Sequence, residues 1–163
     1  MPTSIIHLKV GYEYAKRHKQ YDNKKFYLGI IAPDAVNLNG FAEKEKRWSA
    51  HLRDKNLDVW KSNIINFYIQ NKNHFDNNYI HGYLLHVLTD IFFDEKNPIE
   101  LFPKIQNKVG DEKVREEYSR QMDMYERSQL TTDWWKYVES ALQNSEAETI
   151  NNIEKENIEK WKE

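Results

Sequence analysis

Apolar residues along the chain recur mostly at helical spacing, and strand-like alternation is scarce. The pattern predicts a first helix that Thr3 or Ser4 caps and that runs to about residue 20. A second, amphipathic helix is predicted over about 57–70, with an aromatic and aliphatic inner face made of Trp60, Ile64, Phe67 and Tyr68. The strongest helical pattern spans about 79–93 and carries Leu84, Leu85, Val87, Leu88 and Ile91. We therefore expect an all-α fold, built as a compact multi-helix domain.

Polar breaks and proline residues divide the rest of the chain. The apolar run 26–31 ends at Pro33, and the polar residues from 34 to 40 indicate a loop. Asn97-Pro98 is expected to end the strongest helix, and further helices are predicted over about 104–127 and 133–143. The segment 146–162 is expected to form a terminal amphipathic helix that packs on the body or on a second subunit, which would make a homo-oligomer.

Length and charge narrow the class of protein. A chain of 163 residues suits one domain over 1–163, and its 24 basic and 26 acidic residues give a formal net charge of -2. This balance gives no reason to expect nucleic acid or an anionic membrane as a partner. No apolar run approaches the roughly 20 residues of a spanning helix. With no signal-peptide pattern at the start, the expected location is cytoplasmic.

The chain has no cysteine, so a bound metal must use nitrogen and oxygen ligands. All six histidines precede residue 87, and His86 lies four residues before Asp90. This spacing is about 40° of rotation on a helix, which places both side chains on one face where they can bind one divalent ion. The alternative is that Asp90 pairs with a Lys or Arg and that His86 donates to a backbone carbonyl.

The other histidines and one further aspartate are less distinctive when each is taken alone. Asp34 follows an apolar run and a proline, a common way to place a ligand or base at a cavity mouth, although it could equally cap a helix. His81 is interpreted as a core histidine or a neighbour of the metal ligands, and Gly82 beside it would permit the close approach of another helix. No function is assigned to His18 and His74.

The order of these residues resembles the zinc-dependent phospholipase C family. The resemblance lies in an N-terminal His7, the Pro33-Asp34 carboxylate, a middle His51 and the helix segment from Gly82 to Asp90 with its HxxxD pattern. It covers about residues 1–95, and residues 96–163 are expected to be a helical extension. That family shares an all-helical fold with the S1/P1 nucleases.

The resemblance implies a ligand set. Asp34, His51, His86 and Asp90 would surround one zinc ion, Asp90 would also reach a second ion, and His7 would bind that second ion. Asp34 is also implied as a catalytic general base. The family's further histidines and its HxxxE pattern are absent, so one or two ions is the expected number, with iron or manganese as possible substitutes.

The expected function is therefore metal-dependent hydrolysis of a small phosphate ester, with a phosphodiester favoured and a metal-bound hydroxide as nucleophile. The HD-domain type of phosphohydrolase is disfavoured, because the sequence has no adjacent His-Asp pair. The remaining alternative is a non-enzymatic helical binding module that keeps a structural or residual metal site.

Overall fold

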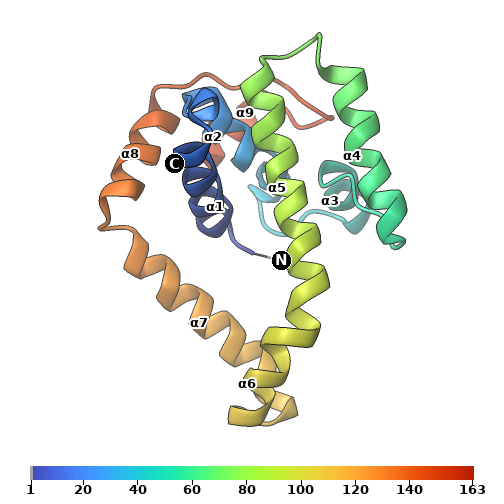
Figure 1. Ribbon diagram of the computed structural model, residues 1–163, viewed down its shortest axis with the longest axis vertical. Coiled ribbons are helices and arrows are strands. Elements are labelled where there is room, and N and C mark those ends of the chain that lie inside the picture. The colour runs from blue at the N-terminus through green and yellow to red at the C-terminus, as the bar shows by residue number, and fades with distance from the viewer. Residues whose placement is uncertain (1) are drawn as a thin grey trace.

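The computed structural model describes residues 2–163, and within them the chain is helical without a β-strand, so the predicted all-α class is confirmed. Nine α-helices and four shorter helical turns follow one another (Figure 1). The helices are α1 (Ser4–Arg17), α2 (Lys24–Ile31), α3 (Lys44–Ala50), α4 (Leu57–Asn71), α5 (Asn77–Lys96), α6 (Phe102–Val109), α7 (Val114–Gln129), α8 (Asp133–Gln143) and α9 (Lys155–Trp161). The turns are η1 (Lys19–Tyr21), η2 (Ala32–Asn37), η3 (Asn97–Leu101) and η4 (Asp111–Lys113). None of these helices is long and apolar enough to cross a membrane.

The centre of the molecule is the packing of α2 against α5. Two glycines make the contact close: Gly29 lies against the backbone of Tyr79, and Gly82 lies against the backbone of Phe26. The expectation that Gly82 permits a close helix approach is thus confirmed. Tyr27, Tyr79 and Tyr83 are fully buried around this crossing, and they contact neighbouring elements: Tyr27 lies against Tyr137 of α8, and Tyr83 stacks on Phe67 of α4.

The predicted helical extension 96–163 has two parts with different roles. The helices α6 and α7 form an arm that extends from the C-terminal end of α5 and leads back to α8 (Figure 1). Ile105 is the one buried side chain of these two helices. In contrast, α8 and the segment after it pack back on the body, where Val138, Ile150 and Ile158 are buried in the main core. Residues 133–163 therefore complete the core that the first half of the chain begins.

Two segments between the main helices differ from the prediction. The prediction of one helix over 104–127 is wrong, because Gly110 adopts a φ of 79° after α6 and the chain turns through η4 into α7. A residue with positive φ ends a right-handed helix, and glycine adopts it without steric cost. The predicted loop from residue 34 likewise begins as the helical turn η2.

The predicted terminal helix over 146–162 is also wrong in its first half. Residues 151 and 152 are asparagines at positive φ, and Ile150 and Ile153 exchange backbone hydrogen bonds of 3.1 and 2.8 Å across them. Positive φ at both central residues is what a tight two-residue hairpin turn requires, and Asn tolerates it. Asn151 also donates to Ser49 O at 2.8 Å and to the Tyr83 hydroxyl at 2.9 Å, which ties this turn to α3 and α5. Only α9 is helical here, and its buried Ile158 packs on the body, which is one of the two roles expected for this segment.

Candidate metal centre

Four segments bring the five expected metal ligands together. His7 comes from α1, Asp34 from η2, His51 from the C-terminal end of α3, and His86 and Asp90 from α5. All five are buried, and Asp90 and His86 are 0% exposed. Because five ionisable or basic side chains seldom gather in a protein interior without a common partner, their convergence identifies this cluster as the candidate site.

Asp90 lies between three imidazoles. Its Oδ1 is 3.3 Å from His7 Nε2, and its Oδ2 is 3.6 Å from His86 Nε2 and 3.7 Å from His51 Nε2. The His7 and His86 rings are stacked, with centroids 3.6 Å apart. The two carboxylate oxygens therefore face different donors, His7 on one side and the His51–His86 pair on the other.

Asp34 forms one group of three possible ligands with His51 and His86. Its Oδ1 lies 3.4 Å from His51 Nε2 and 3.9 Å from His86 Nε2. Zinc bonds of about 2.0–2.1 Å in a tetrahedron separate neighbouring donors by about 3.3–3.4 Å. The observed separations between these nitrogens and oxygens, 3.4–3.9 Å, are slightly wider and need only a small contraction around an ion. His7, His86 and Asp90 form the other group of three, so His86 belongs to both groups.

Backbone carbonyls fix the orientation of two of the histidines. The Nδ1 atom of His86 lies 2.7 Å from Ile30 O, and that of His51 lies 2.8 Å from Arg47 O. A carbonyl only accepts hydrogen bonds, so each Nδ1 carries a hydrogen and each Nε2 faces the cluster. The Nε2 of His51 is hydrogen-bonded there to Asp34 Oδ1 at 3.4 Å, whereas the Nε2 of His86 has no partner. Hydrogen bonds from Nδ1 to a carbonyl are the usual outer support of metal-binding histidines. The expected alternative for His86, donation to a backbone carbonyl, therefore coexists with a metal-binding role.

The inner atoms of the cluster lack hydrogen-bond partners. Among the described residues, His7 Nε2, His86 Nε2 and both carboxylate oxygens of Asp90 are buried without one, because the close approach of His7 to Asp90 does not have hydrogen-bond geometry. Leaving a buried acceptor unsatisfied costs about 1–3 kcal/mol, and more for a charged group. Within residues 2–163 no Lys or Arg pairs with Asp90, so the ion pair expected under the alternative interpretation does not form. A divalent cation would satisfy all of these atoms at once.

The protonation states suit a cation as well. Burial, and then the neighbouring His7, lowers the pKa of His86 to about 3, so His86 is neutral at physiological pH. Burial works against ionisation of Asp34, yet His86 and His51 hold the pKa of its carboxyl well below the usual range. The pKa of Asp90 is also lowered, by the approach of His7 and the other histidines against the effect of burial. Both carboxylates are therefore ionised and can bind a metal.

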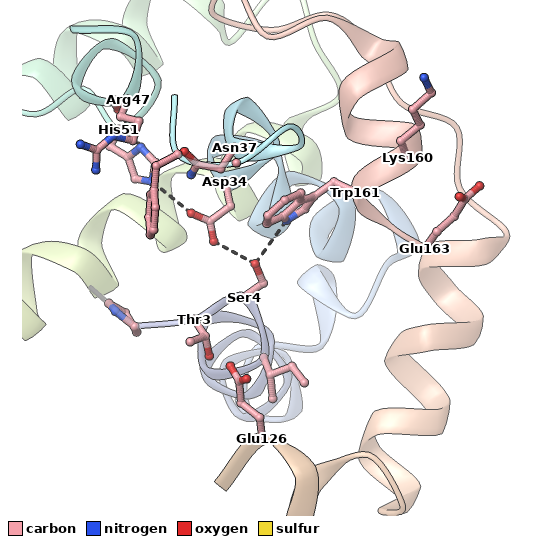
Figure 2. Close-up of a pocket in the computed structure, with 14 residues that line it drawn as sticks. Thr3, Ser4, Asp34, Asn37, Arg47, His51, Glu126, Lys160, Trp161 and Glu163 are labelled. Atoms are coloured by element: carbon pink, nitrogen blue, oxygen red, sulfur yellow. Dashed lines mark hydrogen bonds and ion pairs between the residues drawn. The ribbon is translucent and has the colours of Figure 1, made fainter. Parts of the chain in front are cut away.

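Hydrogen bonds from the side opposite the histidines hold Asp34. The Ser4 hydroxyl donates to Asp34 Oδ2 at 2.9 Å, and the Trp161 indole Nε1 lies 3.3 Å from the same Ser4 oxygen (Figure 2). One oxygen of Asp34 thus faces the histidines while the other is held from the opposite side. The link joins α1, η2 and α9, so the C-terminal helix supports the site through Ser4.

A cavity of about 880 Å³ reaches the cluster at Asp34 and His51. Figure 2 shows Asp34 between His51 on one side and Trp161 on the other, with Ser4 below it. His7, His86 and Asp90 lie deeper and do not line the cavity. The cluster is therefore buried but accessible to a small molecule at one edge.

The remaining histidines lie outside the site. His81 is partly exposed, contacts the rings of Tyr21 and Tyr68, and its Nδ1 lies 2.6 Å from Asn77 O. The interpretation of His81 as a core histidine or a neighbour of the metal ligands is wrong. His18 and His74 are exposed, and the structure gives them no place in the cluster.

Sequence reasoning missed Ser4, Trp161 and Arg47 as residues of the site. The sequence pattern predicts only a capping role for Ser4, and it assigns no role to Trp161 beyond the apolar side of the predicted helix over 146–162. Arg47 precedes His51 by four residues in a helical segment, so the spacing could have placed both on one face.

No family model matches the chain, and neither does a curated protein or a solved structure. The resemblance to the zinc-dependent phospholipase C family therefore rests on the identity and order of the five residues alone.

Proposed function

We propose that this protein is a metal-dependent hydrolase of a phosphate ester, with a phosphodiester as the favoured substrate. The observation that supports it is the buried His/Asp cluster, in which His7 Nε2, His86 Nε2 and both Asp90 oxygens lack hydrogen-bond partners. The Asp34–His51 edge of this cluster meets a cavity. An active site needs such access for its substrate, whereas a cluster that only stabilises the fold does not.

The donor set favours zinc. Imidazole nitrogen and carboxylate oxygen without a thiolate suit zinc, with iron or manganese as possible substitutes. His51, His86, Asp34 and Asp90 would hold the ion, and His7 would bind beside Asp90, where a second ion would also lie. A bound divalent ion lowers the pKa of a coordinated water to about 7, far below that of free water, which would supply a nucleophile at neutral pH.

Asp34 is the proposed catalytic residue. It borders the cavity, it is ionised, and Ser4 fixes the direction of its Oδ2. A carboxylate held in this way at the cavity edge can accept a proton from an attacking water, provided that the water lies within hydrogen-bond reach. Asp34 would then serve both as a metal ligand and as the general base.

A non-enzymatic binding module is the second candidate. If Asp34, His51, His86 and Asp90 all bound one zinc ion, they would complete a tetrahedral shell, which is the coordination number of structural zinc sites, whereas catalytic sites keep one position open. In that case zinc would join η2, α3 and α5 and would stabilise the fold.

The two candidates are separated by metal content and turnover in one preparation. The protein is purified without chelator, its metals are measured by mass spectrometry, and hydrolysis of bis-p-nitrophenyl phosphate is followed with zinc, manganese or iron(II) after chelator treatment. Metal together with turnover that the chelator abolishes supports the hydrolase. Bound zinc without turnover on phosphodiesters and phosphomonoesters supports the module, and the absence of any bound metal contradicts both.

A further inference from the structure

Arg47 is a cation without a carboxylate partner at the cavity wall. It lies one helical turn before His51, and both residues line the cavity (Figure 2). Its Nε donates to Ala42 O at 2.9 Å, while within residues 2–163 its two terminal nitrogens donate no hydrogen bond and no carboxylate lies within ion-pairing distance. A half-buried guanidinium of this kind has two donors ready for a planar or tetrahedral oxyanion.

The cavity also has an aromatic wall. Phe41 lines it while remaining 90% exposed, and its ring lies 5.5 Å from the guanidinium carbon of Arg47. Trp161 lines it as well, and its indole nitrogen is already occupied by Ser4, so it offers the cavity an apolar ring. A volume of about 880 Å³ is far larger than a phosphate group needs. Side chains with flat apolar faces bind flat or apolar organic groups.

Acidic residues limit how much negative charge the cavity accepts. Glu126 and Glu163 line it away from Asp34 and His51 (Figure 2). Lys160 also lines this part of the cavity, which therefore carries two carboxylates and one ammonium group. A ligand with one phosphate near Arg47 avoids these carboxylates, whereas a chain of phosphates would bring like charges together at a cost.

The geometry points to a substrate class: esters that carry a single phosphate and an aromatic or bulky apolar group, with Arg47 binding the phosphoryl oxygens and Phe41 and Trp161 packing on the organic group. This inference rests on the proposed function for the reaction, but the recognition itself is a binding property. The backbone carbonyl of Arg47 also accepts the hydrogen bond from His51 Nδ1. The main chain of Arg47 thus orients a proposed metal ligand, and its side chain would bind the substrate.

Phosphonates test the recognition without turnover, because their carbon–phosphorus bond resists hydrolysis. Binding of (1-naphthylmethyl)phosphonate, methylphosphonate and tripolyphosphate to the zinc-loaded protein is measured by calorimetry. We expect the naphthyl compound to bind at least about tenfold more tightly than methylphosphonate, and tripolyphosphate to gain nothing from its added charges.

The variants separate the two contacts. Arg47→Ala should weaken both phosphonates about ten- to a hundredfold, the range of a hydrogen bond to a charged group, and Arg47→Lys should recover part of the loss. Phe41→Ala should weaken only the naphthyl compound, by about three- to tenfold. Arg127→Ala and Phe92→Ala are the matched controls, since neither residue lines the cavity and both are exposed. Zinc content and melting temperature, measured for every variant, show whether the fold is kept.

Equal affinity for the two phosphonates, or wild-type binding by a folded Arg47→Ala variant, would overturn the inference. Hydrolysis of bis-p-nitrophenyl phosphate is measured on the same samples. The expected binding pattern without turnover keeps this inference and removes the proposed hydrolase activity, and turnover without the pattern does the reverse.

Discussion

Gly29 of α2 and Gly82 of α5 are reciprocal: a Cβ at Gly29 would lie 2.0 Å from Tyr79 O, and a Cβ at Gly82 would lie 2.0 Å from Phe26 O. Because each glycine lacks a Cβ, the backbone of the opposite helix can approach it closely. The close crossing brings Ile30 O within 2.7 Å of His86 Nδ1, which orients His86 for the cluster. Two residues that have no chemistry of their own therefore control the geometry of the candidate metal site.

Gly82→Ala should separate α2 from α5. The new Cβ would meet backbone atoms, which cannot move without shifting a helix, so we expect a loss of about 1–3 kcal/mol in the free energy of unfolding. The bond from His86 to Ile30 O should lengthen, and zinc affinity should fall with it. Urea denaturation and a zinc titration check the two effects. Leu88→Ala, at an exposed position of the same helix, is the control, and an equal effect of both substitutions would contradict the role of the glycine.

Removing a metal ligand should abolish zinc binding. Loss of an outer hydrogen-bond partner of a ligand typically costs 10–100-fold in metal affinity, so His86→Ala or Asp90→Ala should cost more than about 100-fold. His18→Ala and His74→Ala change exposed histidines outside the cluster and should leave the zinc content unchanged. Metal analysis of the four purified variants decides, and equal zinc content in all of them would rule out the site.

Zinc binding should strengthen with rising pH. Burial by itself lowers the pKa of His51, but the Asp34 contact and the charges of Asp90 and Asp34 outweigh burial and raise it. Since the folded-state pKa lies above the unfolded one, the proton on His51 stabilises the metal-free fold at low pH, and this contribution disappears as the pH rises through the raised pKa. Zinc must displace that proton from Nε2, so the gain in melting temperature on adding zinc should be larger at pH 8 than at pH 6. A gain that is constant or larger at pH 6 would contradict this titration.

The helices and the site differ in how far the sequence predicts them. The helix of His86 and Asp90 was predictable because a long apolar pattern at helical spacing carries both residues on one face. His7, Asp34 and His51 could be added only through their order in the chain, because spacing says nothing about contacts between separate helices. The helix predicted over 146–162 is wrong in its first half because Ile150, Ile153 and Ile158 also fit a helical face. The turn at 151–152, where both asparagines have positive φ, is held by hydrogen bonds of Asn151 to distant residues, which no local pattern predicts. The Trp161–Ser4–Asp34 link joins residues at opposite ends of the chain, and no local pattern encodes it.

The Ser4 hydroxyl should control how Asp34 binds a metal. Ser4→Ala removes the bond to Asp34 Oδ2, so the carboxylate can rotate and offer both oxygens to the ion. We expect zinc affinity to fall about tenfold, at the lower end of the range for an outer partner of a metal ligand. The visible spectrum of the cobalt(II) protein should shift toward higher coordination, because a second oxygen joins the ion. Ser4→Thr keeps a hydroxyl and should restore the original spectrum, whereas Ser62→Ala, which removes an exposed hydroxyl of α4, should not change it. Trp161→Phe loses only the indole donor and should give a smaller change in the same direction. An unchanged cobalt spectrum in folded Ser4→Ala would show that Asp34 is positioned without Ser4.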